Sequence, residues 1–212
     1  MVGMSLAVFL ASQGIKTLAC ERHVSTVIHP RAAFFISRTI EIFRSFGLMK
    51  PMLIESEKYP VIWHCWGRHY DSHAGIVGVE SLAGRKIASY LEDMNHDIGS
   101  LTPGMRLFLP QHIFEPLLRT SCKELGAELR FSTEVTDVQQ DADGCVSTVK
   151  SLQTGEIRKI KSKYVVACDG SRSPMRKRLG IELIGYGEMS RSITIYFKVS
   201  LLPAALTPGR RL

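Results

Sequence analysis

Near the start of the chain, a glycine and an acid stand at the spacing of a dinucleotide-binding βαβ unit. Gly3 precedes a helix pattern over 4–12, a strand pattern covers 15–20, and Glu21 follows that strand directly. In such units, N–H groups at the helix N-terminus bind a pyrophosphate, and the acid accepts hydrogen bonds from ribose hydroxyls. Spacing alone leaves a nucleotide site and an ordinary fold equally open. In the ordinary fold, Gly3 allows close helix packing, and Glu21 is a surface acid at the end of a strand.

A second motif, Asp169-Gly170, ends the stretch "YVVACDG", whose apolar residues predict a buried strand. Ser173 is a candidate N-cap and Pro174 a candidate first helical residue, so a short helix should begin directly after the motif. An acid and a glycine between a strand and a helix can hold the phosphates or hydroxyls of a ligand. The alternative is a plain turn, which the local pattern by itself favours, since Asp-Gly is a common turn pair.

A third segment, "HCWGRHYDSH", holds residue types that ligate zinc, namely His64, Cys65, His69 and His73. Structural zinc needs four convergent nitrogen or sulfur ligands. His69 and His73 would share a face only in a helix, which Gly67 and the aromatic residues disfavour. We therefore predict no metal site, and we expect structural or substrate-lining roles for these side chains.

Helices and strands must position these residues. A clear helix over 111–125 has an apolar side and contains Pro116, which is tolerable only near the first turn. A further helix covers 38–46, with Ser37 as its candidate N-cap. Short strands and loops are expected over 59–109. The other strand patterns cover 127–139, 145–153, 157–168 and 191–200, with turn signals at 141–144 and 154–155.

Composition places the chain among ordinary folded proteins. It has 212 residues, 45% of them hydrophobic, and a formal charge of +7 spread along the sequence. The charge makes anionic ligands plausible, but basic clusters interleaved with aromatic residues are missing, so a nucleic-acid-binding module is disfavoured. Five cysteines without a C-x-x-C pair favour a reducing compartment over a disulfide scaffold. No apolar run is long enough for a bilayer span, and "MSLAVFLAS" lacks the basic flank of a signal peptide.

Four stretches, taken in order, resemble the FAD-dependent aromatic hydroxylases, the flavoprotein monooxygenases that include phenol and p-hydroxybenzoate hydroxylases. "VGMSLAVFLASQGIKTLACER" is similar to that family's first helix and second strand. "HPRAAFFISRTIEIFRSFGL" is similar to its arginine-containing loop and the following helix. "LPQHIFEPLLR" resembles its segment with a flavin-contacting glutamine, and "VVACDGSRSPMRKRLGI" resembles its Asp-Gly motif. Each stretch is a weak signal singly, but jointly they are specific.

The resemblance implies a cofactor site. Arg31 would lie near the FAD phosphates, where the alternative is a loop salt bridge, and Gln111 would lie near the ribityl chain, where the alternative is a helix cap. Glu21 would bind the adenosine ribose. The full set of implied cofactor-binding residues is Gly3, Glu21, Arg22, Arg31, Gln111, Asp169 and Gly170.

The implied activity is that of an FAD-dependent monooxygenase. In the family, NAD(P)H reduces FAD, and the reduced flavin uses dioxygen to hydroxylate an electron-rich, usually phenolic, ring. The cofactor carries that chemistry. No catalytic side chain is identifiable, since the loop residues 32–35 do not titrate. The expected partner is a small aromatic substrate, with no nucleic acid and no stable membrane insertion, in the cytoplasm. A catalytically inactive remnant of such an enzyme is the alternative.

The expected fold is α/β, an incomplete Rossmann-like FAD-binding domain with a β-meander and part of a substrate-domain sheet. Compared with the family, the chain lacks the first strand, the first two glycines and a later Gly-Asp motif. Several hundred Å² of lost burial would cost on the order of 10 kcal/mol, so we expect poor solubility. The predicted parts are two FAD-binding segments, 1–58 and 106–182, a substrate-side insertion, 59–105, and the start of the substrate sheet, 183–212.

Overall fold

The computed structural model describes residues 1–58, 76–80, 85–91, 101–104, 106–191 and 193. The chain forms two compact units, which are Met1–Arg31 with Gln111–Arg191, and Ala32–Pro110 with Ser192–Leu212. All seven implied cofactor-binding residues belong to the first unit. The predicted boundaries at 58, 105 and 182 stay predictions. The possible zinc ligands and almost all of the strand expected over 191–200 lie outside the described residues.

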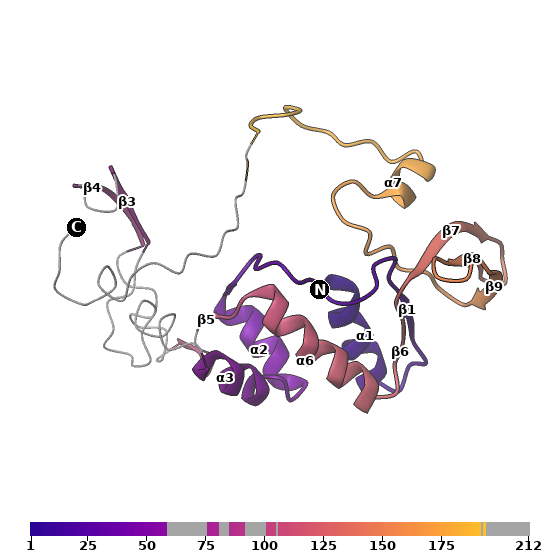
Figure 1. Cartoon of the computed structure of the whole chain (residues 1–212), viewed down its shortest axis with the longest axis horizontal. Coiled ribbons are helices and arrows are strands. Elements are labelled where there is room, and N and C mark those ends of the chain that lie inside the picture. The colour runs from indigo at the N-terminus through magenta and orange to yellow at the C-terminus, as the bar shows by residue number, and fades with distance from the viewer. Residues whose placement is uncertain (59–75, 81–84, 92–100, 105, 192, 194–212) are drawn as a thin grey trace. The chain divides into compact units, whose positions relative to one another are not determined.

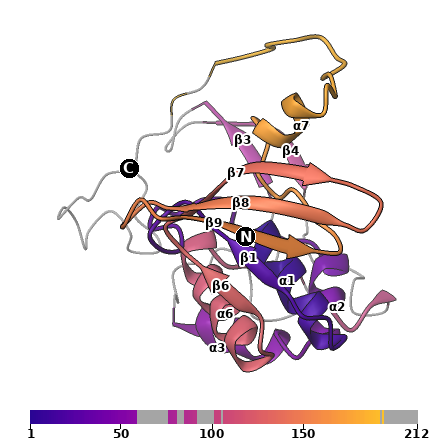
Figure 2. The same ribbon diagram turned by 90° about the vertical axis from the view of Figure 1, so that its right-hand side faces the viewer.

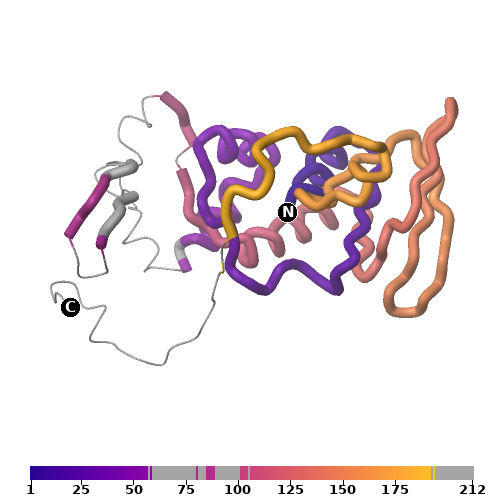
Figure 3. Tube along the Cα trace, turned by 90° about the horizontal axis from the view of Figure 1, so that it is seen from above, coloured from indigo at the N-terminus to yellow at the C-terminus, as the bar shows by residue number. Residues whose placement is uncertain are grey.

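Two helices and a pair of short parallel strands form the core of the first unit. Helix α1 (Val2–Ser12) packs against α6 (Gln111–Glu124), as Figures 1 and 3 show for the indigo and pink helices. Strand β1 (Leu18–Cys20) pairs in parallel with β6 (Glu128–Arg130). The helix and strand expected between Gly3 and Glu21 are therefore confirmed, and the parallel pair agrees with the α/β class.

The buried side of α6 follows the helical repeat. Phe114, Leu118 and Cys122 stand four residues apart and are fully buried. From α1, Ala7 and Val8 are buried as well. Residues four apart lie on one face of a helix, so this stripe faces a single neighbour. The small side chain of Ala7 lets a neighbour approach closely.

Pro116 lies deeper in α6 than expected. Because the helix begins at Gln111, Pro116 falls in its second turn and cannot donate to the carbonyl of His112. The helix nevertheless continues to Glu124, so the rule that confined this proline to the first turn is wrong here. The buried side chains on either side hold the helix through tertiary packing, which contributes more than one missing backbone bond.

Three antiparallel strands form the predicted β-meander. They are β7 (Thr133–Gln140), β8 (Cys145–Ser151) and β9 (Ile157–Ser162), and Figure 2 shows them side by side. At the first turn, the carboxylate of Asp141 accepts the N–H groups of Asp143 at 2.9 Å and Gly144 at 3.0 Å. At the second, Gly155 takes a φ of 75°, which glycine adopts readily. Both turn predictions are confirmed.

The buried strand predicted for "YVVACDG" is wrong. Residues 164–170 form no strand, and Tyr164 and Val166 keep 78% and 61% of their surface exposed. An extended segment becomes a strand only when a neighbour takes its N–H and C=O groups. In the described part of the chain, β1 and β6 pair with each other and neither pairs with this segment. Apolar composition alone therefore gave the wrong answer.

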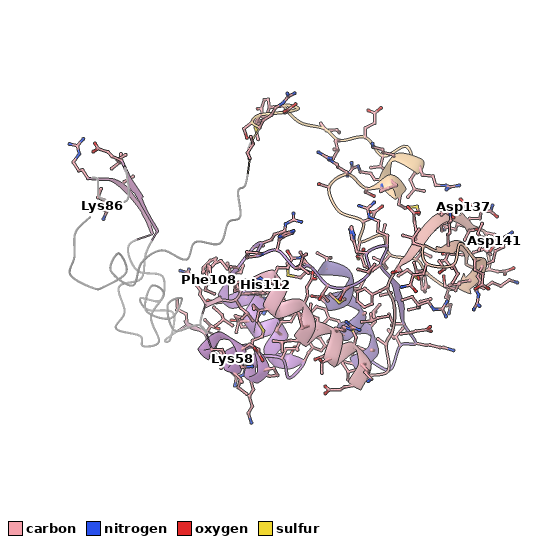
Figure 4. The ribbon with its side chains drawn as sticks, in the orientation of Figure 1. Lys58, Lys86, Phe108, His112, Asp137 and Asp141 are labelled. Atoms are coloured by element: carbon pink, nitrogen blue, oxygen red, sulfur yellow. The ribbon has the colours of Figure 1, made fainter. Side chains whose placement is uncertain are left out.

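The helix predicted after this segment is confirmed as α7 (Pro174–Arg178). The Ser173 hydroxyl accepts the Arg176 N–H at 2.9 Å, and Pro174 is the first helical residue. Arg178 forms an ion pair with Asp137 of β7. Figure 4 labels Asp137. This pair ties α7 to the meander.

The second unit contains short elements. Strand β2 (Phe34–Phe35) pairs antiparallel with β5 (Leu107–Phe108), and β3 (Ile76–Val79) pairs antiparallel with β4 (Lys86–Leu91). Helix α2 (Ser37–Ser45) packs against α3 (Met49–Glu57). Sequence reasoning missed α3. The rings of Phe35 and Phe43 meet edge to face, with centroids 6.1 Å apart. Ser37 is not the N-cap of α2, because Ile36 holds that place and the buried Ser37 hydroxyl has no hydrogen-bond partner in the described structure.

Candidate functional site

The first turn of α1 lies against the segment that carries the Asp-Gly motif. A Cβ placed on Gly3 would lie 3.4 Å from the Cβ of Cys168, the residue before Asp169. Two motifs from opposite ends of the sequence are thereby brought together in one unit. A contact of 3.4 Å is ordinary van der Waals distance, so packing against Cys168 does not by itself require glycine at this position.

Asp169 belongs to the N-terminal cap of α7. Its carboxylate accepts the Met175 N–H at 3.0 Å. A hydrogen bond from the Ser173 side chain is the largest cause that lowers the pKa of Asp169, and the residue stays exposed. Gly170 takes a φ of 79°, where a side chain would be strained, and the space beside it is open. The turn interpretation of Asp-Gly is thus satisfied, and one face of the motif remains accessible.

Glu21 lies directly after β1 and is exposed. Its main chain is fixed on both sides, because its N–H donates to Arg130 at 2.8 Å and its carbonyl accepts from Thr133 at 2.9 Å. Its carboxylate accepts the His23 N–H at 2.9 Å. One carboxylate oxygen therefore rigidifies the following turn, while Arg22 beside it is exposed.

Arg31 and Gln111 meet through their main chains. The Gln111 N–H donates to the Arg31 carbonyl at 2.9 Å, at the start of α6, where Figure 4 labels the next residue, His112. Arg31 is exposed, and no partner of its guanidinium is found among the described residues. The salt-bridge alternative for Arg31 thus has no support in the described part of the chain. The two residues predicted to contact one cofactor lie next to each other.

Glu115 is a site residue that sequence reasoning missed. It is 4% exposed, and its carboxylate receives the Gln111 Nε2 at 2.7 Å, the Val27 N–H at 2.8 Å and the Met1 amino group at 2.7 Å. Burial raises the pKa of Glu115, but these donors outweigh it and the net shift is downward. The available signal was an acid four residues after Gln111, within the apolar side of a helix.

Two thiols of this unit, those of Cys122 and Cys168, are not activated as nucleophiles. Burial raises the pKa of Cys122 to about 11. Burial also raises the pKa of Cys168, and the nearby Asp169 charge adds to that rise. Reactivity needs the thiolate, so both thiols stay protonated near neutral pH. In the part of the chain that the structure describes, no group of three or more metal-ligating residues occurs, and no helix is long and apolar enough to cross a bilayer.

Together these groups fit the parts of a dinucleotide cofactor. A helix N-terminus with Gly3 and the exposed cations Arg22 and Arg31 suit phosphates. The carboxylate of Glu21 suits ribose hydroxyls, which donate hydrogen bonds. All of them belong to a single compact unit.

Comparison with known families identifies the family of the chain. The model of the FAD binding domain family matches residues 1–209, nearly the whole chain. The chain therefore belongs to the FAD binding domain family.

Its relatives include monooxygenases and hydroxylases. The chain is 42% identical to 4-methyl-5-nitrocatechol 5-monooxygenase of Burkholderia sp over 93% of its length, and 34% identical to aklavinone 12-hydroxylase DnrF of Streptomyces peucetius over 98%. Among solved structures, the flavin-dependent monooxygenase PieE in complex with FAD and substrate matches 84% of the chain with a TM-score of 0.70 and 31% identity. The chain spans 34% of the Burkholderia enzyme, 41% of DnrF and 30% of PieE.

Proposed function

We propose that this chain supplies FAD-binding residues of a monooxygenase that hydroxylates an electron-rich aromatic, usually phenolic, ring with NAD(P)H and dioxygen. When bound, FAD supplies the redox chemistry. The protein binds and orients that cofactor and the ring. The observation that carries the proposal is the gathering of Glu21, Arg31, Gln111 and Asp169 in one compact unit of a chain that belongs to an FAD-binding family.

The proposed residue roles are those that the resemblance to the FAD-dependent aromatic hydroxylases implies. Arg31 and the N-terminus of α1 bind the phosphates, with Gly3 allowing close approach and Arg22 adding positive charge. The carboxylate of Glu21 accepts hydrogen bonds from the adenosine ribose. Gln111 contacts the ribityl chain. Asp169 and Gly170 lie against the cofactor on the accessible face of their turn.

The substrate class is proposed from the relatives. One relative is a nitrocatechol monooxygenase, another is 2,4-dichlorophenol 6-monooxygenase of Delftia acidovorans, and a third is an aklavinone hydroxylase. Two of these names contain a catechol or a phenol, which supports a phenolic substrate here. We further propose a cytoplasmic location, supported by the four free cysteines among the described residues.

FAD binding tests the proposal directly. The purified chain, titrated with FAD, should quench flavin fluorescence and turn yellow after gel filtration. Arg31→Ala should weaken binding about tenfold or more, because a charge-assisted bond contributes roughly 1.5–3 kcal/mol. Arg44→Ala, which removes another exposed arginine, should not change the affinity. A chain that takes up no FAD would overturn the proposal.

Activity separates an enzyme from an inactive relative. NADH and NADPH oxidation should be measured with catechols and phenols as substrates, together with the hydroxylated product. Substrate-stimulated oxidation by this exact chain would exclude the inactive alternative. FAD binding without turnover would assign the chain the binding role only.

A further inference from the structure

Glu115 is an ionised acid within an otherwise apolar helix side. Its neighbours Phe114 and Leu118 have no exposed surface, and its own side chain is 6% exposed. A buried charge is costly unless it is paired and hydrogen-bonded. Three donors from different parts of the unit satisfy it, from Met1, Val27 and Gln111. An apolar residue would pack at this place without such a set of partners.

We propose that Glu115 is a positioning residue for the cofactor site, which orients the Gln111 side-chain amide and fixes the segment that carries Arg31. The inference rests on the proposed function, since Gln111 and Arg31 are the groups assigned to the cofactor. Glu115 itself does not touch the ligand.

The amide orientation follows from the chemistry of the two groups. An ionised carboxylate only accepts hydrogen bonds, and of the two ends of a glutamine amide only the NH₂ donates. The 2.7 Å contact between Gln111 Nε2 and Glu115 Oε1 therefore holds the NH₂ toward the acid. The carbonyl oxygen is then left to accept from a ligand, which suits the hydroxyls of a polyol chain.

The Arg31 segment is fixed at two points, both on α6. The Val27 N–H donates to Glu115 Oε2, and the Arg31 carbonyl accepts from the Gln111 N–H. Between these points lie the residues that lead to the exposed guanidinium. Fixing both ends reduces the conformational entropy that ligand binding would otherwise have to remove.

The first test needs no cofactor. The ¹⁵N-labelled chain gives side-chain NH₂ signals, and those of Gln111 are assigned by their loss in Gln111→Ala. The NH₂ hydrogens of Gln111 should exchange with water at least about tenfold more slowly than those of the exposed Gln140, because they donate to a buried carboxylate. Glu115→Gln, which keeps the shape but replaces the carboxylate by a neutral acceptor, should lower that protection, because a charge-assisted hydrogen bond is roughly twice as strong as a neutral one. Glu124→Gln, an exposed acid on the same helix, should leave it intact. Equal exchange at Gln111 and Gln140 in the unchanged chain would overturn the inference.

The second test measures coupling in FAD binding. Glu115→Gln should weaken FAD binding about tenfold in the unchanged background but no more than about threefold in a Gln111→Ala background, because a residue acting through Gln111 loses its effect when Gln111 is absent. Equal factors in both backgrounds would show that Glu115 does not act through Gln111 and would overturn its role in orienting that amide. Glu124→Gln is again the control.

The two arms separate the failure of this inference from the failure of the proposed function. If the unchanged chain binds no FAD, the proposed function fails, and the exchange of the Gln111 amide still decides whether Glu115 orients it. If FAD binds and Glu115→Gln leaves the affinity unchanged, the positioning role fails while the FAD-binding proposal stands.

Discussion

Two acids of the first unit, Glu115 and Asp169, are held in opposite ways. Glu115 is buried on α6 and receives donors from sequence-distant places, including Val27. Asp169 is exposed and accepts the N–H of Met175, a few residues further along the chain. A long-range bond to a buried charge fixes separate segments relative to each other, whereas a local bond shapes only its own turn.

This difference also separates two pairs of predicted cofactor residues. Arg31 and Gln111 are joined by a backbone bond and connect to Glu115, so the fold itself fixes them. Asp169 and Gly170 keep a local turn conformation through the cap of α7 and the positive φ of the glycine. We expect the first pair to be preorganised for a ligand, and the second to depend more on the ligand for its order.

The largest expected effect is that of removing the buried acid. Glu115→Ala should lower the free energy of unfolding by about 1–3 kcal/mol, because the Val27 N–H and the Gln111 amide lose a buried acceptor. Urea unfolding followed by circular dichroism measures it. A loss below about 1 kcal/mol would show that water replaces the carboxylate, and it would contradict the distinction between Glu115 and Asp169.

Low pH should lower the free energy of unfolding through Glu115. The pKa of Glu115 is lowered from its ordinary 4.5, so its stabilisation is present above about pH 4.5 and is lost as the pH falls through the folded-state pKa. Unfolding free energies at pH 7, 5, 4 and 3 should therefore converge between the unchanged chain and Glu115→Gln as the pH falls. A constant difference across this range would contradict the assignment.

Removing the exposed acid should cost less. Asp169→Ala deletes a solvent-screened bond to Met175, so we expect a loss of about 0.5–1 kcal/mol at most. Asp169→Asn keeps an acceptor and should lose less still. The same unfolding experiment applies, and a cost as large as that of Glu115→Ala would erase the distinction between the two regions.

A small effect on folding is also expected at Gly3. Gly3→Ala places its methyl at ordinary contact distance from Cys168, so the unfolding free energy should change by no more than about 1 kcal/mol. Under the proposed function, the same change weakens FAD binding, because the methyl obstructs the approach of the phosphates. Unchanged FAD affinity would favour the packing interpretation of this glycine.

Much of the fold was predictable where local signals act alone. Local sequence patterns identified α1, α2 and α6, and strand patterns with turn residues between them identified the meander. The failures have a common physical cause. The apolar run at 164–168 does not become a strand because no described strand pairs with it, and Pro116 is tolerated in α6 because packing outweighs a lost bond.

The sequence by itself determined the chemical types of the candidate site and their order along the chain, from Gly3 and Glu21 through Arg31 and Gln111 to Asp169. Residue types and local spacing carry that information. Tertiary structure alone decided that Gly3 lies against Cys168, that the Gln111 N–H donates to the Arg31 carbonyl, and that Glu115 accepts the Val27 N–H. These contacts link residues far apart in sequence, and whether an acid becomes a buried acceptor depends on the donors that folding brings to it.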